Sequence, residues 1–204
     1  MQDTRDPLNL IVCGTGGQGN VLLSRFLARM MAKKGYQITI GETFGASQRG
    51  GAVMSHVRLS RAATYGALIP EGKAHLIIGL EPMETIRVLG IYGNPEIAVV
   101  SNVYPVHPIK TVIGENSYPN IEEMKRVIQE ISAKCWFLNA TRISIDMGNP
   151  VLANMVMIGA LTRTNELNLT RPEVDEMIHE TFPGKAAGVN IEAASLGFQR
   201  VEAQ

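Results

Sequence analysis

The sequence is poor in the residues that build metal and redox sites. Its 204 residues include only two cysteines, Cys13 and Cys135, and each lies in or beside an apolar run. Iron–sulfur clusters usually take four thiolates, so this chain cannot hold one by itself on cysteine ligands. Buried thiols that behave as small hydrophobic groups are the expectation for both. The four histidines lack a ligand spacing such as H-x-x-x-H, so we expect no metal site on the chain.

Net charge is also lacking, because Lys plus Arg and Asp plus Glu each number 19. The absence of a basic footprint argues against a nucleic-acid partner. A chain without net charge has no long-range self-repulsion and is open to association. No apolar run approaches the ~20 residues that a membrane span needs, and the first residues, MQDTRDP, show no signal-peptide pattern. We therefore expect no membrane association and a cytoplasmic location.

Several catalytic signatures are missing as well. The Lys that ends a Walker A loop is absent, since Asn20 and Val21 follow the glycines, and there is no G-x-S-x-G nucleophile elbow. No cluster of carboxylates or histidines suggests acid–base chemistry. The sequence therefore predicts no complete active site and no catalytic residue on this chain.

The chain does contain a glycine-rich stretch at Leu8–Gly19, LNLIVCGTGGQG. An apolar run is followed at once by Gly14, Gly16 and Gly19, which have the spacing G-x-G-x-x-G, and then by an amphipathic segment. Strand, glycine turn and helix in this order are the context that the dinucleotide fingerprint requires. The free N–H groups and the dipole of the helix N-terminus predict a site for a phosphate or another anion. A tight turn that binds nothing is the alternative.

Glu42 follows the next predicted strand, 23 positions after Gly19. In a nucleotide-binding βαβ unit an acidic residue at this place accepts hydrogen bonds from the ribose hydroxyls. A solvated carboxylate at a strand end explains the spacing equally well, so both interpretations stay open.

A second glycine cluster fills the loop Thr43–Gly51, TFGASQRGG, which includes Arg49. Loops beyond the carboxyl ends of strands form the ligand crevice of doubly wound sheets. The guanidinium of Arg49 suits a phosphate or a carboxylate. We expect this loop to face the same crevice as the first glycine turn. An exposed, mobile loop is the alternative.

Strands alternate with helices along the chain, which predicts one α/β domain, residues 1–204, with a doubly wound, mostly parallel, Rossmann-like sheet and a helical C-terminal part. Strand 52–60 follows too short a loop for a crossover helix, so we expect it to run antiparallel. A polar pair, Ser101 and Asn102, follows a predicted strand where the crevice would lie. After the first strand and helix, the predicted strands are 36–41, 52–60, 75–79, 96–100, 109–113 and 135–140, and the predicted helices are 81–89, 119–131, 151–161, 170–181 and 185–198.

Several motifs, in this order, resemble the gamma subunit or domain of the 2-oxoacid:ferredoxin oxidoreductases, and most of all the small beta subunit of the indolepyruvate enzymes. The residues that carry the resemblance are Gly14, Thr15, Gly16, Gly17, Gln18 and Gly19, then Glu42, then Ser47, Gln48, Arg49, Gly50 and Gly51, and further Ser55–Arg58, Glu81–Glu84 and Asn149–Ala160. The resemblance covers nearly the whole chain.

The resemblance implies an accessory subunit within a larger enzyme. Catalytic partner subunits would carry thiamine diphosphate and iron–sulfur clusters, decarboxylate a 2-oxoacid oxidatively to its acyl-CoA and pass electrons to ferredoxin. The two glycine loops would bind a phosphate-bearing group such as coenzyme A at the interface, or cap the thiamine site, with Arg49 on an anionic group and Gln18 bonding across the interface. The apolar C-terminal helices would favour a homodimer of the isolated chain.

Two other functions stay open at this stage. A stand-alone oxidoreductase that binds a nicotinamide or flavin cofactor would use the glycine fingerprint together with Glu42. A non-catalytic nucleotide-binding scaffold would use the glycine turn alone. Binding of NADH or flavin absorbance would identify the first, and genomic neighbours without a thiamine-diphosphate subunit would favour the second.

Overall fold

The structure is a computed structural model that describes residues 5–44, 51–107 and 117–203. Within these residues one seven-stranded sheet has the order β2-β3-β1-β4-β5-β6-β7. The strands are β1 (Leu8–Thr15), β2 (Gln37–Phe44), β3 (Ala52–Ser60), β4 (Leu76–Gly79), β5 (Ala98–Asn102), β6 (Lys134–Leu138) and β7 (Glu202–Ala203). The helices are α1 (Asn20–Lys33), α2 (Pro82–Tyr92), α4 (Ile121–Glu130), α5 (Ala140–Asp146), α6 (Ala153–Thr164), α7 (Arg171–Thr181) and α8 (Lys185–Arg200), with a 3-10 turn, η1 (Pro150–Leu152), before α6.

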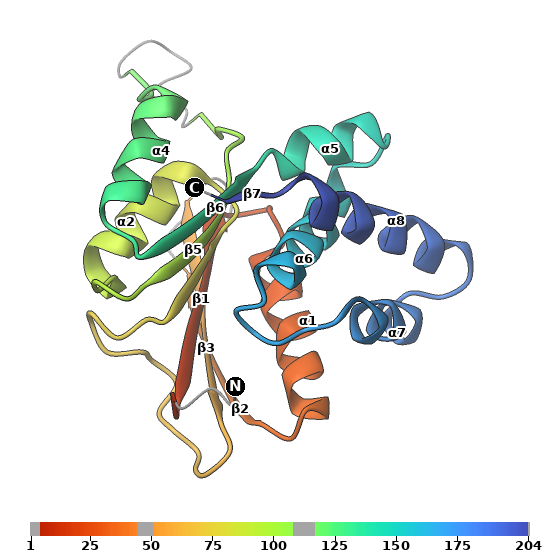
Figure 1. The fold of residues 1–204 in the computed structure, drawn as a ribbon, viewed down its shortest axis with the longest axis horizontal. Helices are drawn as coiled ribbons and strands as arrows, with labels where there is room; N and C mark the ends of the chain where they lie inside the picture. The colour runs from red at the N-terminus through yellow and green to blue at the C-terminus, as the bar shows by residue number, and fades with distance from the viewer. Residues whose placement is uncertain (1–4, 45–50, 108–116, 204) are drawn as a thin grey trace.

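Helices cover both faces of the sheet (Figure 1). One face carries α1, α6, α7 and α8, and the other carries α2 and α4. Strand β1 lies between the two layers with all eight residues buried. Its alternate side chains divide between the layers, since Leu10 and Val12 join the first core whereas Ile11 and Cys13 join the second. Such two-sided burial explains why this stretch is apolar without interruption.

The α/β class is confirmed, but the sheet is mixed. Pairs β1–β4, β4–β5 and β5–β6 are parallel, whereas β1–β3, β2–β3 and β6–β7 are antiparallel. The antiparallel direction expected for residues 52–60 is confirmed. Strand β3 lies between β1 and β2, because Val12 pairs with Ser55, which in turn pairs with Glu42. The sheet is therefore parallel only over its four central strands, β1-β4-β5-β6, and antiparallel towards both edges.

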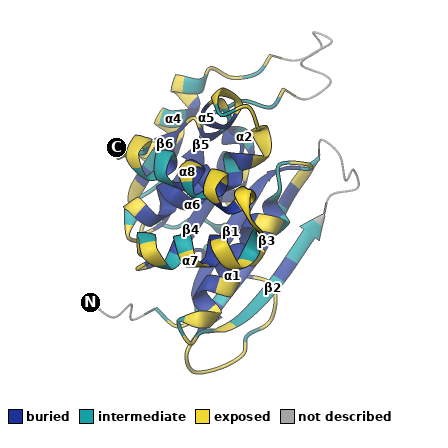
Figure 2. Ribbon diagram, turned by 90° about the vertical axis from the view of Figure 1, so that its right-hand side faces the viewer, coloured by how far each residue is buried: buried dark blue, intermediate teal, exposed yellow. Residues whose placement is uncertain are grey.

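Helices α6 and α8 pack with their backbones in close contact. A Cβ on Gly159 of α6 would lie 2.6 Å from the carbonyl carbon of Ala194, and one on Gly197 of α8 would lie 2.7 Å from that of Val156. Nine consecutive residues of α6, Asn154 to Thr162, are buried, and α6 is dark along most of its length in Figure 2. The apolar helix predicted near residues 151–161 is thus buried by α8 of the same chain.

Most predicted elements are present, with ends that shift. The strand expected at 135–140 stops at Leu138, because the side chain of Asn139 accepts a hydrogen bond from the Arg142 N–H and begins α5 there. Ser101 and Asn102 lie inside β5 instead of after it. The elements α5, η1 and β7 were not predicted from the sequence. The strand expected at 109–113 lies outside the described residues.

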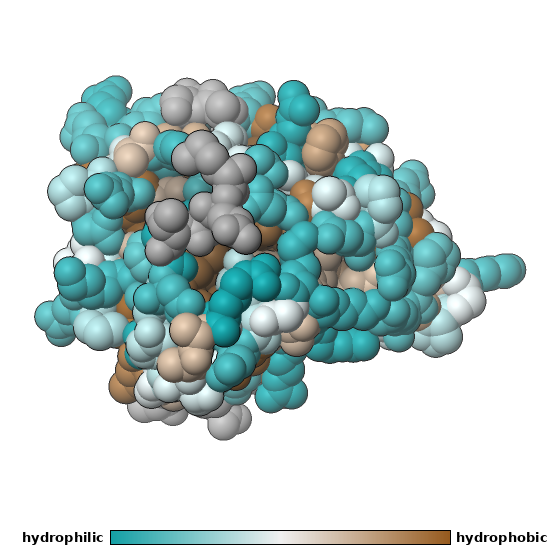
Figure 3. All heavy atoms as spheres, turned by 60° about the horizontal axis from the view of Figure 1, so that its bottom comes forward, coloured by the Kyte–Doolittle hydropathy of each residue, from teal (hydrophilic) through white to brown (hydrophobic). Residues whose placement is uncertain are grey.

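Among the described residues, none of the helices combines the length and the apolar character that crossing a bilayer requires. Hydrophilic residues dominate the face drawn in Figure 3, with apolar residues scattered among them.

Candidate functional site

The first glycine turn connects β1 to α1 with backbone conformations that favour glycine. Gly17 has φ 100° and Gly19 has φ 83°. Gly19 is the N-cap of α1, so no side chain caps the N–H groups of the first turn. The first intrahelical bond that reaches back to the cap runs from Leu23 N–H to the Gly19 carbonyl, at 3.0 Å. The first-turn N–H groups of Asn20, Val21 and Leu22 have no side-chain cap and can serve a ligand at the carboxyl end of β1.

Gln18 holds this turn against the neighbouring strand. Its side-chain oxygen accepts a hydrogen bond from the Thr15 N–H at 2.7 Å, and its side-chain NH₂ donates to the Leu80 carbonyl at 3.0 Å. A Cβ on Gly14 would lie 2.6 Å from that oxygen, so Gly14 leaves the room that Gln18 needs. The Gln18 amide thus makes two bonds within the chain, and the bond across an interface stays a prediction.

The second glycine cluster begins to be described at Gly51, whose carbonyl accepts a hydrogen bond from the Gly16 N–H at 2.8 Å. This bond places Gly51, the end of the second loop, beside the first turn. That the loop faces the same crevice stays a prediction. The other four predicted residues of that loop, Ser47, Gln48, Arg49 and Gly50, lie outside the described residues.

Glu42 lies away from the glycine turn. Because β3 separates β2 from β1, the Glu42 backbone is two strand spacings, roughly 10 Å, from β1. Its carboxylate is 3.4 Å from the guanidinium of Arg25 on α1. In the nucleotide-binding arrangement the acidic residue ends the strand adjacent to the first. Ribose binding by Glu42 would have to bridge that gap and to compete with Arg25.

Two cavities flank the turn. The first, about 380 Å³, lies on the β3 side and is lined by Thr15, Gly16, Gly17, Gly19, Asn20, Val21 and Val53. The second, about 350 Å³, lies on the α6 side, between the turn, the ends of β4 and β5, and the starts of α5 and η1. We call these the turn cavity and the α6 crevice. Both lie where β1 is followed by a helix on one face and β4 by a helix on the other, the usual ligand position of α/β sheets.

Asn102 fixes the floor of the α6 crevice. Its NH₂ donates to the Leu80 carbonyl and to the Thr141 hydroxyl, each at 2.9 Å, and its oxygen accepts from the Ala140 N–H at 2.9 Å. This buried amide therefore ties β4, β5 and α5 together. The sequence correctly indicated Asn102 as a polar residue near a crevice.

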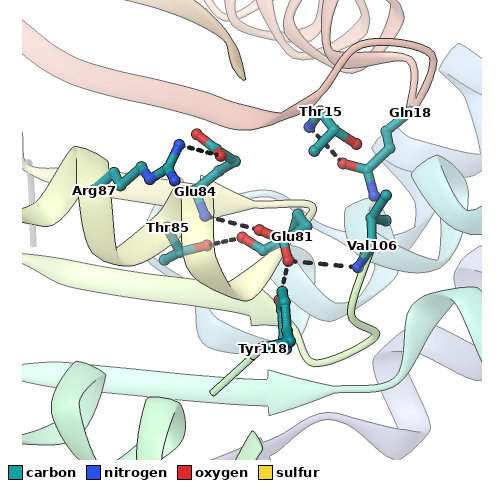
Figure 4. A network of polar contacts seen from close by, with 8 residues as sticks. All are labelled: Thr15, Gln18, Glu81, Glu84, Thr85, Arg87, Val106 and Tyr118. Carbon is teal, nitrogen blue, oxygen red and sulfur yellow. Dashed lines mark hydrogen bonds and ion pairs between the residues drawn. The ribbon is translucent and has the colours of Figure 1, made fainter. Parts of the chain in front are cut away.

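A buried carboxylate, Glu81, begins α2 beside the same edge of the sheet (Figure 4). It is 1% exposed and accepts hydrogen bonds from the Glu84 N–H at 2.8 Å, the Val106 N–H at 3.5 Å and the Tyr118 hydroxyl. Burial, and secondarily the Glu81 carboxylate, raises the pKa of Tyr118. The Tyr118 hydroxyl therefore stays protonated and donates the hydrogen bond to Glu81. Burial also raises the pKa of the Glu84 carboxyl, while Arg87 at 3.0 Å opposes that shift. Glu81 thereby joins Val106 and Tyr118, which lie between β5 and α4 in the sequence.

The two thiols are buried and chemically quiet. Cys13 is 1% exposed and Cys135 is 4% exposed, and burial raises both pKa values. They lie on β1 and β6, three strand spacings or roughly 14 Å apart. In the described part of the chain no group of three or more His, Cys, Asp or Glu side chains is arranged to hold a metal ion.

Sequence reasoning missed one further residue of the site. Asn154 of α6 is 5% exposed and lines the crevice, and its side-chain oxygen has no hydrogen-bond partner in the described structure. A Cβ on Gly19 would collide with its side-chain NH₂. The available signal was the one amide within the apolar run 151–161.

Comparison with known proteins gives consistent matches over almost the whole chain. The family model for pyruvate ferredoxin/flavodoxin oxidoreductase matches residues 9–200. The indolepyruvate oxidoreductase subunit IorB of Pyrococcus horikoshii is 37% identical over 190 residues, which are 93% of each chain.

Two solved structures share the fold. The crystal structure of pyruvate oxidoreductase subunit PORC from Thermotoga maritima superposes with a TM-score of 0.72 at 15% identity, covering 98% of this chain and 99% of that chain. The 2-oxoglutarate:ferredoxin oxidoreductase from Magnetococcus marinus, solved with 2-oxoglutarate, coenzyme A and succinyl-CoA bound, gives 0.71 at 21% identity. It covers 96% of this chain and 31% of that longer chain.

Proposed function

The chain belongs to the pyruvate ferredoxin/flavodoxin oxidoreductase family, and from this membership we propose that it is the accessory subunit of a 2-oxoacid:ferredoxin oxidoreductase. The observation that carries the proposal is the relative at 37% identity, which is itself named a subunit and matches over 93% of both chains. The enzyme would decarboxylate a 2-oxoacid oxidatively, form its acyl-CoA and pass electrons to ferredoxin. The name of that relative favours an arylpyruvate such as indolepyruvate as the substrate.

The proposal divides the chemistry between subunits. The partner would carry thiamine diphosphate and the iron–sulfur clusters, because the residues of this chain do not suit a cluster. Cys13 and Cys135 are buried on strands three spacings apart, and burial raises the pKa of both thiols. A cysteine that binds a metal is a thiolate, which a raised pKa disfavours. This chain would supply binding surfaces and orientation next to cofactors held elsewhere.

In this proposal the turn cavity takes a phosphate-bearing group such as coenzyme A. The uncapped N–H groups at the start of α1 are suitable donors for phosphate oxygens. The space beside Gly17 is open, since a Cβ there would meet nothing within 4 Å. Arg49, with Ser47, Gln48 and Gly50, would complete the site from the second loop, which ends beside the turn at Gly51.

The subunit assignment is tested by co-expression with the neighbouring genes under anaerobic conditions and purification through this chain. We expect a brown complex that contains a thiamine-diphosphate subunit and reduces a dye with an arylpyruvate and coenzyme A. A colourless chain that elutes alone and binds NADH would overturn the proposal in favour of a simple dinucleotide-binding protein.

The ligand assignment is tested in that assembled complex with Arg49→Ala. We expect a higher KM for coenzyme A or for the oxoacid. Arg126→Ala, an exposed cation on α4, is the matched control and should leave both constants unchanged. Unchanged constants in Arg49→Ala would remove Arg49 from the site.

A further inference from the structure

The α6 crevice has a largely apolar wall. None of its lining residues carries a charge at neutral pH. Apolar side chains such as Leu22, Leu80, Val106 and Met157 form most of its wall. The turn cavity also has no charged side chain among its described lining residues, but the second loop, whose sequence includes Arg49, ends beside that cavity at Gly51. No cation is among the described residues that line the α6 crevice. The crevice therefore suits an uncharged group with apolar flanks.

Three side-chain amides line this crevice among the described residues, and of these three only Asn154 has an oxygen without a hydrogen-bond partner. The amides of Gln18 and Asn102 bond through both their oxygen and their NH₂ within the chain. The Asn154 oxygen is buried without a partner in the described structure. A buried acceptor without a donor is unfavourable, so its presence calls for a donor that the folded chain does not itself provide.

The polar groups around Asn154 define the complementary ligand. Gly19, whose backbone contacts the Asn154 side chain, also begins α1, and the first-turn N–H groups of that helix have no side-chain cap. The crevice thus offers an acceptor at Asn154 and donors close by. A group that presents a donor and an acceptor on the same side matches both, and one residue of an extended peptide does so with its own N–H and C=O.

The rim of the crevice is apolar and exposed. Leu22 is 43% exposed and Val151 is 75% exposed, and both line the opening. Exposed apolar side chains around a cavity are typical of a surface that another polypeptide covers. In the 2-oxoglutarate:ferredoxin oxidoreductase structure this fold is only 31% of a longer chain, so there the rest of the polypeptide is covalently attached to it.

We infer that the α6 crevice receives an uncharged peptide segment of the catalytic partner subunit, whose backbone amide pairs with Asn154 and whose apolar side chains contact Leu22 and Val151. This inference rests on the proposed function, and it assigns to Asn154 a role in assembly. The turn cavity remains a separate site for a phosphate-bearing group.

The first test replaces Asn154 by leucine, which keeps the size of the side chain and removes its unpaired oxygen. We expect the isolated subunit to keep or raise its melting temperature, because the unpaired acceptor is gone. We expect the co-expressed holoenzyme to dissociate on dilution at about tenfold higher concentration, measured by mass photometry. Asn102→Leu is the matched control and should lower the melting temperature, since it breaks bonds to Leu80 and Ala140.

A second variant guards against an effect on folding. Val151→Asp places a charge on the exposed rim and should weaken assembly without lowering the melting temperature of the subunit. Val189→Asp, an exposed valine on α8 that does not line the crevice, should leave assembly unchanged.

The inference would be overturned if the wild-type complex assembles and both Asn154→Leu and Val151→Asp dissociate at the same concentration as the wild type. It would also be overturned by intact assembly with a raised KM for coenzyme A, because the crevice would then hold the coenzyme. A wild-type chain that never assembles with a thiamine-diphosphate subunit would instead refute the proposed function itself.

Discussion

The close packing of α6 on α8 predicts a large stability loss from the addition of one methyl group. In Gly159→Ala the new Cβ would lie 2.6 Å from the carbonyl carbon and 2.9 Å from the Cα of Ala194. Carbon atoms pack at about 3.5–4.0 Å, and the Ala194 carbonyl oxygen is nearer still, so the helices must separate by more than about 1 Å at this point. The obstructing atoms belong to the backbone of α8 and cannot turn away as a side-chain end could.

Overpacking a core typically costs ~1–3 kcal/mol, and a backbone obstruction places Gly159→Ala near the upper end of that range. For a chain of this size each kcal/mol lowers the melting temperature by roughly 2–4 °C, so we expect a decrease of roughly 6–12 °C. Thermal unfolding followed by circular dichroism measures the shift. Urea titration gives the free energy of unfolding independently of the thermal scan.

The same contact provides an internal control and a coupling test. Gly188 lies on α8 where an added Cβ would meet nothing within 4 Å, so Gly188→Ala should stabilise the chain by ~0.5–1 kcal/mol. Gly197→Ala should resemble Gly159→Ala, because its Cβ would meet the Val156 backbone of α6. The double variant should cost less than the sum, since helices that are already separated accommodate both methyl groups. Unfolding free energies of Gly159→Ala and wild type within about 0.5 kcal/mol would refute the reasoning.

Three further predictions concern the site and the core. Gly17→Ala should lower the free energy of unfolding by about 1–2 kcal/mol, because alanine is strained at the positive φ of this position. Gly19→Ala should lower it further, because its Cβ would also displace the Asn154 side chain. Equal losses for the two variants in urea titrations would contradict this. Burial, with Arg58 nearby, lowers the pKa of His56 from 6.5, so below that pH the unfolded chain binds a proton that the folded chain does not. The free energy of unfolding should therefore fall between about pH 7 and about pH 5.5. The decrease should be smaller in His56→Gln. Tyr118→Phe removes a hydrogen bond to a buried carboxylate and should cost about 1.5–3 kcal/mol in the same titrations, and a cost near zero would show that the bond contributes little.

Local signals in the sequence are sufficient for much of the fold. The apolar run of β1 predicts a strand buried on both faces, and Gly35 with φ 82° ends α1 as its sequence position indicates. Thr170 caps α7 in a full capping box with Glu173. These elements depend on neighbouring residues, which is why the sequence alone identifies them.

Features that depend on distant contacts were not predictable. The position of β3 between β1 and β2 is set by strand pairing, and the alternation in residues 52–60 does not say which neighbours those residues take. The two residues of β7 form a strand only because β6 lies beside them. At the site, the glycine spacing indicates the turn, whereas the bonds of Gln18 and the unpaired oxygen of Asn154 depend on residues remote in the sequence.

The hydrogen bond between Gly16 and Gly51 has a consequence for how such subunits diverge. It joins two main-chain atoms and therefore places no demand on the side chains around it. Mutations in the second loop can change its chemistry while the end of that loop stays beside the first turn. Matching proteins named for indolepyruvate, pyruvate and 2-oxoglutarate show that this fold has been kept among enzymes of different oxoacids. A hydrogen bond between backbone atoms lets the side chains near a ligand change while the backbone that positions them stays the same.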